Sequence, residues 1–170
     1  MTENLEKISV MLKYKGAEKT FSAPPEEAWF LLSKFFSEFL PSFDVANKLL
    51  LTVDLQQLAK DCEGLIAFSP EGANLLVSKT KLTDNETLLL WLLANYLGYK
   101  LDMMATDEIS KEELQAKLGK SSKITSTRLG ELAKSYLVVK TANEKFKVTT
   151  FGVTQLQKNL LRRIKAKTNA

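Results

Sequence analysis

A run of 13 residues without a charged side chain, from Thr87 to Tyr99, is the feature that most constrains the fold. It follows Thr83-Asp84-Asn85-Glu86, a capping box in which the threonine hydroxyl and the glutamate carboxylate accept hydrogen bonds from unpaired backbone N–H groups. The sequence predicts a helix that begins here and ends near Tyr96 or Leu97, before Gly98. Apolar side chains occupy nearly all of its sides, which is typical of a buried helix. A bilayer-spanning helix needs roughly 20 residues, so we expect the core of a soluble protein.

Two shorter helices are predicted after this one. Ser110-Lys111-Glu112-Glu113 is a second capping box, and Gly119 ends the helix that it begins. Ser121 or Ser122 then caps a third helix, over about residues 122–136. Two short helices joined by about three residues around a glycine form a helix-turn-helix. The buried stripe expected for the third helix consists of Ile124/Thr125, Leu129, Leu132/Ala133 and Tyr136.

The segment after these helices predicts a hairpin and a closing helix. Residues 137–140 have the composition of a strand, 141–145 that of a polar hairpin tip, and 146–149 that of a returning strand. Apolar residues then recur at helical spacing, and lysine and arginine surround them. The inner positions of this closing helix are Val153, Leu156, Leu160/Leu161 and Ile164.

In this order of elements, residues 82–164 resemble the winged helix-turn-helix DNA-binding domains of bacterial and archaeal regulators. The stretches that carry the resemblance are 109–114 with Leu118-Gly119, 122–129 with Leu132, and 136–139 followed by Val148-Thr149-Thr150-Phe151-Gly152. The resemblance implies that a recognition helix at about 122–136 enters the major groove, beside a basic wing at 138–149. Gly130 departs from an ordinary recognition helix, because glycine costs roughly 0.5 to 1 kcal/mol inside a helix.

Candidate DNA-binding residues follow from this geometry. Arg128 is the candidate for reading guanine, since a guanidinium can donate to O6 and N7 together. Ser126 and Thr127 can bind a base or a phosphate, and Ser121 and Ser122 lie at a helix N-terminus, which favours a phosphate. The lysines expected to add positive charge on the outer face of the helix and on the wing are Lys123, Lys140, Lys145 and Lys147.

Charge is distributed unevenly along the chain. Residues 1–82 carry nine lysines and 11 acidic residues, whereas residues 83–170 carry 15 basic and nine acidic residues. From Leu114 to Ala170 there are 13 basic residues against only Glu131 and Glu144. Such a segment is typical of a domain that binds a polyanion. The alternative to polyanion binding is a solvent-exposed basic surface that only aids solubility.

The first half predicts a small α+β unit that resembles no family. Alternation over 8–14 and a run at 19–23 predict a hairpin around Gly16. Pro24-Pro25 then begins a helix that ends at Pro41, with an aromatic stripe facing the core. The stripe comprises Trp29, Leu32, Phe36 and Phe39/Leu40, widened by Phe30 and Phe35.

A helix at 54–60 capped by Asp54, a strand at 65–68, and a helical segment from Ser69 to about Val77 complete the expected first domain, residues 1–82. The second domain is then 83–170. Residues 78–82 contain neither glycine nor proline, so we expect the two domains to pack closely. The whole chain is expected to be α+β.

Several function classes are excluded or disfavoured. The chain has no histidine and one cysteine, Cys62, which removes histidine-dependent hydrolases and cysteine–histidine zinc sites. It also lacks a glycine-rich phosphate loop and an acidic cluster with calcium-loop spacing. We expect no enzyme activity, no cofactor and no metal. The N-terminus does not resemble a signal peptide, so a cytoplasmic protein is expected, bound to the nucleoid if it binds DNA.

Three functions from different classes remain open. The first is a DNA-binding protein, either a transcription regulator or a chromosome-associated factor. The second is a winged-helix interaction module in a larger assembly, with an acidic partner. The third is an RNA- or ribosome-associated factor, because positive charge alone does not separate DNA from RNA. A homodimer through residues 1–82 or the closing helix is also expected, since two half-sites raise affinity. If aromatic rings of the helix at 29–39 are exposed, they favour a protein contact through the first half.

Overall fold

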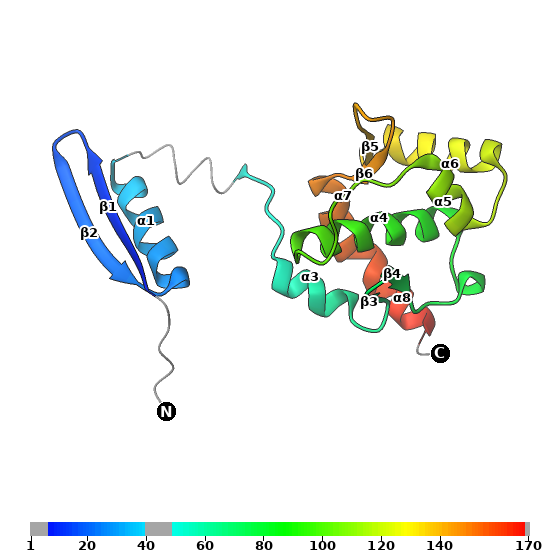
Figure 1. Cartoon of the computed structure of the whole chain (residues 1–170), viewed down its shortest axis with the longest axis horizontal. Helices are drawn as coiled ribbons and strands as arrows, with labels where there is room; N and C mark the ends of the chain where they lie inside the picture. The colour runs from blue at the N-terminus through cyan, green and yellow to red at the C-terminus, as the bar shows by residue number, and fades with distance from the viewer. Residues whose placement is uncertain (1–6, 40–48, 169–170) are drawn as a thin grey trace. The chain divides into compact units, whose positions relative to one another are not determined.

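The structure is a computed structural model that describes residues 7–39 and 49–168, and it has the α+β class expected. Its helices and strands are grouped in two compact units, residues 1–50 and residues 51–170, which we call the N-terminal and C-terminal units. Each unit is described by itself. Figure 1 shows the order of the elements along the chain.

Over residues 7–39, the N-terminal unit has a hairpin followed by a helix. Strands β1 (Ile8–Tyr14) and β2 (Ala17–Ala23) are antiparallel, with Val10 opposite Phe21. Gly16 has a left-handed φ of 84° in the turn, which is easiest for glycine. Helix α1 (Pro25–Phe39) packs against the hairpin (Figure 1) and buries Ala28 and Phe35.

The aromatic stripe expected on this helix does not face a core throughout. Trp29 and Phe30 are 65% and 64% exposed, whereas Phe35 is buried. A two-stranded sheet covers only one narrow side of a helix, so aromatic residues elsewhere on α1 stay in solvent. The predicted stop at Pro41 lies outside the described residues.

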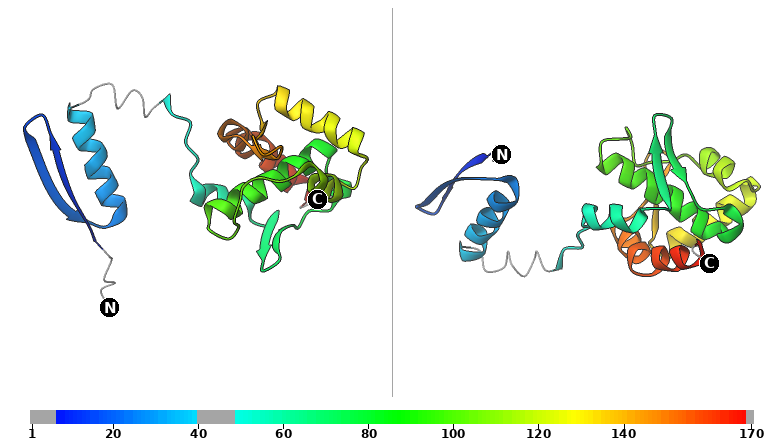
Figure 2. Two further views of the ribbon diagram at one scale, coloured as in Figure 1. Left: turned by 45° about the horizontal axis from the view of Figure 1, so that its top comes forward. Right: turned by 90° about the horizontal axis from the view of Figure 1, so that it is seen from below.

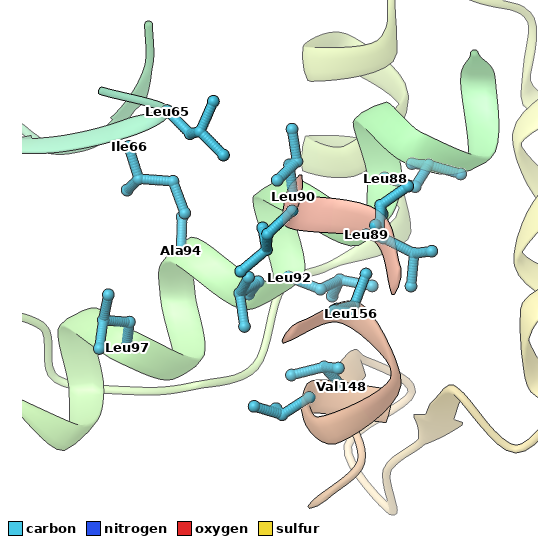
Figure 3. Packing of buried hydrophobic residues seen from close by; sticks show 14 of the residues in the cluster. Leu65, Ile66, Leu88, Leu89, Leu90, Leu92, Ala94, Leu97, Val148 and Leu156 are labelled. Atoms are coloured by element: carbon cyan, nitrogen blue, oxygen red, sulfur yellow. The ribbon is translucent and has the colours of Figure 1, made fainter. Parts of the chain in front are cut away.

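In the C-terminal unit, helix α4 (Asp84–Lys100) lies at the centre, as its sequence predicts. Figure 3 shows its leucines surrounded by side chains from other elements, among them Leu65, Val148 and Leu156. The capping box is formed: Thr83 Oγ1 accepts from the Glu86 N–H at 3.2 Å, and the Thr83 N–H donates to Glu86 Oε2 at 2.8 Å.

Gly98 does not end this helix, contrary to the prediction. The helix continues to Lys100, and a Cβ built on Gly98 would lie 2.7 Å from Met104 Sδ and 2.8 Å from a ring carbon of Phe68. Glycine at this position allows close packing within the helix.

Residues 51–82 belong to the C-terminal unit, so the structure divides the chain at residue 50 and not at residue 82. Helix α3 (Leu55–Cys62), capped by Asp54 as predicted, contributes Leu58 and Cys62 to the core around α4. The helical segment expected from Ser69 to Val77 is wrong. A second hairpin, β3 (Ile66–Ser69) and β4 (Gly72–Leu75), occupies these residues, and the 3₁₀ turn η1 (Lys79–Lys81) leads into α4.

The remaining elements follow in the predicted order. They are α5 (Lys111–Leu118), α6 (Ser122–Lys134), β5 (Val138–Lys140), β6 (Phe146–Val148), α7 (Thr150–Gln155), the π turn η2 (Leu156–Leu160) and α8 (Leu161–Thr168). Figure 2 shows the same ribbon from two further directions.

The predicted inner positions of these elements are largely buried. All five inner residues of the closing helix, from Val153 to Ile164, are in the core. On α6, Thr125, Leu129 and Leu132 are buried, but Ile124 and Tyr136 are exposed, the latter by 77%. Tyr136 follows the end of α6 and has a left-handed φ of 57°, so it leaves the helical stripe. Over residues 7–39 and 49–168, no helix is both long and apolar enough to cross a membrane.

Candidate nucleic-acid interface

The turn between α5 and α6 is fixed by caps at both helix ends. Gly119 ends α5 in the left-handed region, with φ 72°. Ser121 is the N-cap of α6, and its Oγ accepts from the Ile124 N–H at 3.3 Å. Ser122 is the first helical residue and is exposed. The two serines therefore lie at an open helix N-terminus, as predicted, with the Ser121 oxygen already engaged in the cap.

The outer face of α6 carries lysine and short polar side chains. Lys123, Thr127 and Lys134 are exposed, on the side opposite the buried Leu129. The Thr127 hydroxyl donates to the Lys123 carbonyl at 2.9 Å, so it is occupied within the helix. Among the described residues, neither Lys123 nor Lys134 forms an ion pair.

Arg128 lies on the flank of α6 toward the start of α4, not on the outer face. Its Nη1 donates to both carboxylate oxygens of Glu131 at 3.0 Å, and its Nε lies 3.8 Å from Asp84 Oδ2. The hydrogen bond from Arg128, joined by one from Asn85, holds the pKa of Glu131 below its ordinary value of 4.5. The guanidinium is thus already paired with two carboxylates. The spacing of Arg128 and Glu131, three residues apart on a helix, is the sequence signal for this pair.

The hairpin β5–β6 is anchored to the chain before α5. Backbone hydrogen bonds in both directions join Ile109 and Phe146, at 2.9 and 2.8 Å. Asn143 at the tip donates to Glu108 at 3.3 Å. These contacts hold the hairpin at a fixed position beside α5 and α6.

The three candidate lysines of the hairpin have different surroundings. Lys140 is paired with Glu144, and Lys147 lies 3.6 Å from Asp107. Lys145 has no ion pair within the part of the chain that the structure describes. Only Lys145 therefore offers an uncompensated charge on the hairpin.

A cleft of about 630 Å³ lies between α6, the start of α5 and the hairpin. Ser126, Gly130 and Ala133 of α6 line it, and these small side chains leave it open. A Cβ added to Gly130 would meet nothing within 4 Å, so the glycine makes no close approach to another part of the chain. The charged residues of the cleft are Lys111, Glu112, Lys140, Glu144 and Lys145.

The cleft brings together Ser126, Lys140 and Lys145 of the nine candidates, and adds Lys111. Sequence reasoning missed Lys111 because it stands in the predicted capping box at 110–113, where a helix-start role explains it; in the structure Ser110 caps α5, but no hydrogen bond from the Ser110 N–H to the Glu113 side chain completes the box. The sequence does contain a signal for the cleft itself: the spacing of Ser126, Gly130 and Ala133 places three small residues on one side of α6.

Metal-ligand clusters and the cysteine are two further kinds of candidate site. No group of three or more acidic or cysteine side chains there could hold a metal ion. Cys62 is buried, and burial, with a smaller contribution from Asp61, raises the pKa of its thiol to about 12. A thiol of this kind stays protonated and is a core residue.

Comparisons with known proteins give no assignment for this site: no family model, no curated protein and no solved structure matches the chain.

Proposed function

We propose that the C-terminal unit is a winged-helix domain that binds nucleic acid, and duplex DNA in particular, with α6 and the hairpin β5–β6. The observation that carries this proposal is the cleft between these two elements, which has Lys111 and Lys145 on its walls without acidic partners. Lys123 and Lys134 extend the same set of unpaired charges along the outer face of α6.

Unpaired lysines favour a polyanion for a physical reason. A lysine already held by a carboxylate gains little from a phosphate, whereas a free lysine displaces counterions condensed on the nucleic acid. A major groove about 12 Å wide accepts a helix with its side chains. With α6 in that groove, a sugar–phosphate strand can pass along the cleft between the helix and the hairpin.

The surroundings of Arg128 favour contacts with phosphates over base reading. To read guanine, its guanidinium would have to leave both Glu131 and Asp84. Point charges such as Lys123 and Lys145 position a protein on DNA but carry little sequence information. Of the two DNA-binding roles, a chromosome-associated factor, acting at the nucleoid, is therefore the better fit.

Binding of the full chain to duplex DNA, single-stranded DNA and RNA, measured by fluorescence anisotropy over a salt series, tests the proposal. Lys145→Gln and Lys123→Gln should each weaken duplex binding and reduce the slope of log affinity against log salt by about one unit. Lys15→Gln, at an exposed lysine of the N-terminal unit, is the matched control and should change neither quantity. Absence of duplex binding at low salt would contradict the proposal. Tighter binding to RNA than to duplex DNA would make RNA the ligand of this domain.

A protein-interaction module is the second candidate. Ion pairs compensate Arg128, Lys140 and Lys147, and the exposed Tyr136 and Val139 lie near the hairpin in sequence. Such a mixture of paired charges and exposed apolar side chains is common at protein interfaces. It becomes the leading candidate if no nucleic acid binds.

A further inference from the structure

The N-terminal unit has a small core over the residues that the structure describes. Over its described residues, only Ala23, Ala28 and Phe35 are buried. A domain of about 60 residues buries only about 60% of the surface of its unfolded chain and is marginally stable, and the N-terminal unit, residues 1–50, is shorter still. The unit contains no cysteine and no histidine, so neither a disulfide nor a cysteine–histidine metal site is available to it. Association with a second surface would add buried apolar area to this small unit.

The exposed side of α1 has the pattern of a contact surface. Glu26, Phe30 and Lys34 stand four residues apart, so they follow one another along the side away from the buried Ala28 and Phe35. All three are exposed, Phe30 by 64%, and the exposed Trp29 lies next to them. Within the described residues, neither Glu26 nor Lys34 has an ion-pair partner.

The order of these side chains along α1, acidic, then aromatic, then basic, makes two antiparallel copies of the helix complementary in charge. A two-fold axis at Phe30 places Glu26 of one copy opposite Lys34 of the other, twice, and brings the two Phe30 rings together. In a two-fold interface each such contact occurs in both directions. A parallel arrangement would instead place like charges opposite each other.

We infer that α1 forms an antiparallel pair with α1 of a second copy of this chain, with Phe30 at the centre and Glu26–Lys34 pairs on both sides. The pairing removes Phe30 and Trp29 from solvent, so α1 gains a second buried side, opposite the side that packs on the hairpin. This inference does not depend on nucleic-acid binding, and its test needs none.

Charge reversal on the full-length protein tests the pairing by sedimentation. Glu26→Lys and Lys34→Glu alone should each weaken self-association by roughly tenfold, because attractive pairs become repulsive. An equimolar mixture of the two variants should form a heterodimer, because each reversed charge then meets an opposite one. The double variant Glu26→Lys/Lys34→Glu should self-associate like the wild type.

Apolar contact is tested separately. Phe30→Ser should weaken the dimer by more than tenfold, as expected for a central aromatic residue. Met103→Ser, at an exposed apolar residue of the C-terminal unit, is the matched control and should not change it. A wild-type protein that remains monomeric at high micromolar concentration would overturn the inference, and so would a dimer that neither charge variant weakens. Failure of the mixed variants to associate would overturn the antiparallel arrangement.

Discussion

At the scale of single residues, two helical glycines have opposite surroundings. A Cβ on Gly152 of α7 would lie 2.2 Å from the Leu137 carbonyl oxygen and 2.9 Å from Val148 Cγ2, whereas one on Gly130 of α6 meets nothing. Gly152→Ala should therefore lower the free energy of unfolding by at least about 2 kcal/mol, through overpacking. Gly130→Ala should raise it by roughly 0.5 to 1 kcal/mol, because alanine favours the helix. Urea denaturation of both variants measures these changes, and equal effects would contradict the packing around Gly152.

Glu86 is a buried carboxylate that joins two helices. It accepts from the Thr83 N–H at 2.8 Å and from Arg163 Nη2 at 2.7 Å, and Lys167 Nζ lies 3.3 Å away. Burial alone raises the pKa of Glu86, but the Thr83 hydrogen bond and the two cations lower it by more, so the pKa falls below the ordinary 4.5. A carboxyl whose pKa is lower in the folded than in the unfolded state stabilises the fold at pH values above its unfolded-state pKa. This stabilisation is lost as the pH falls through the folded-state pKa.

Glu86→Gln should therefore lower the free energy of unfolding at neutral pH by about 1 to 3 kcal/mol, since a buried charged hydrogen-bond network is broken. It should also make stability less sensitive to pH below 4.5. Glu144→Gln, at an exposed ion pair of the hairpin tip, is the matched control and should leave both quantities nearly unchanged. Denaturation curves over a pH series measure the effect, and an unchanged pH dependence would contradict the role of Glu86.

At the scale of elements, the start of α6 offers a matched pair of serines. Ser121 accepts from the Ile124 N–H, whereas Ser122 makes no cap hydrogen bond. Ser121→Ala should cost about 1 kcal/mol of stability, the usual value for an N-cap. Ser122→Ala should change the free energy of unfolding by no more than a few tenths of a kcal/mol, because alanine suits the first turn at least as well as serine. If thermal unfolding shows the same loss for both, the assigned cap is incorrect.

Elements with local signals could be predicted from the sequence. The capping oxygens of Thr83, Ser110 and Ser121 act between residues three apart, so they give the starts of α4, α5 and α6 directly. The hairpin β3–β4 could not be predicted, because Ser69-Pro70-Glu71 suits a helix start and a turn equally. Packing on α4, which a local sequence pattern does not show, decides between the two.

For the candidate site, the sequence predicts which residue types lie near α6 and the hairpin, but not which of these residues form ion pairs. Lysines near α6 and the hairpin are where the sequence places them, but some of the carboxylates that pair with the basic residues come from distant segments. Asp107 pairs with Lys147 and Asp84 with Arg128, and both acids stand more than 35 residues from their partners in the chain. Only the folded arrangement shows which charges remain free.

At the scale of the whole molecule, the excess positive charge and the hydrophobic core cluster belong to the same unit. Residues 51–170 contain 18 basic and 13 acidic residues, whereas residues 1–50 contain six and seven. The core cluster that the structure describes lies entirely in the C-terminal unit, from Leu58 to Ile164. One unit thus has a large core and excess positive charge, and the other has exposed aromatic residues and almost no net charge.

The boundary between the units predicts which fragment folds. Residues 51–170 contain every member of that core cluster, so this fragment should unfold cooperatively on its own. A fragment that begins at residue 83 keeps α4 to α8 but lacks Leu58, Cys62, Leu65, Ile66 and Val77, all of which pack on the same core. Loss of such large buried side chains costs several kcal/mol, as much as the whole stability of many domains.

Circular dichroism and urea denaturation of the two fragments make the comparison. We expect a single sharp transition for residues 51–170, and helical content without a cooperative transition for residues 83–170, because the apolar surface of α4 that faces α3 and β3–β4 is then left in solvent. Equal stability of the two fragments would mean that α3 and the second hairpin contribute little to the core. In that case the boundary at residue 82, which charge and capping signals favour, would be the true division of the chain.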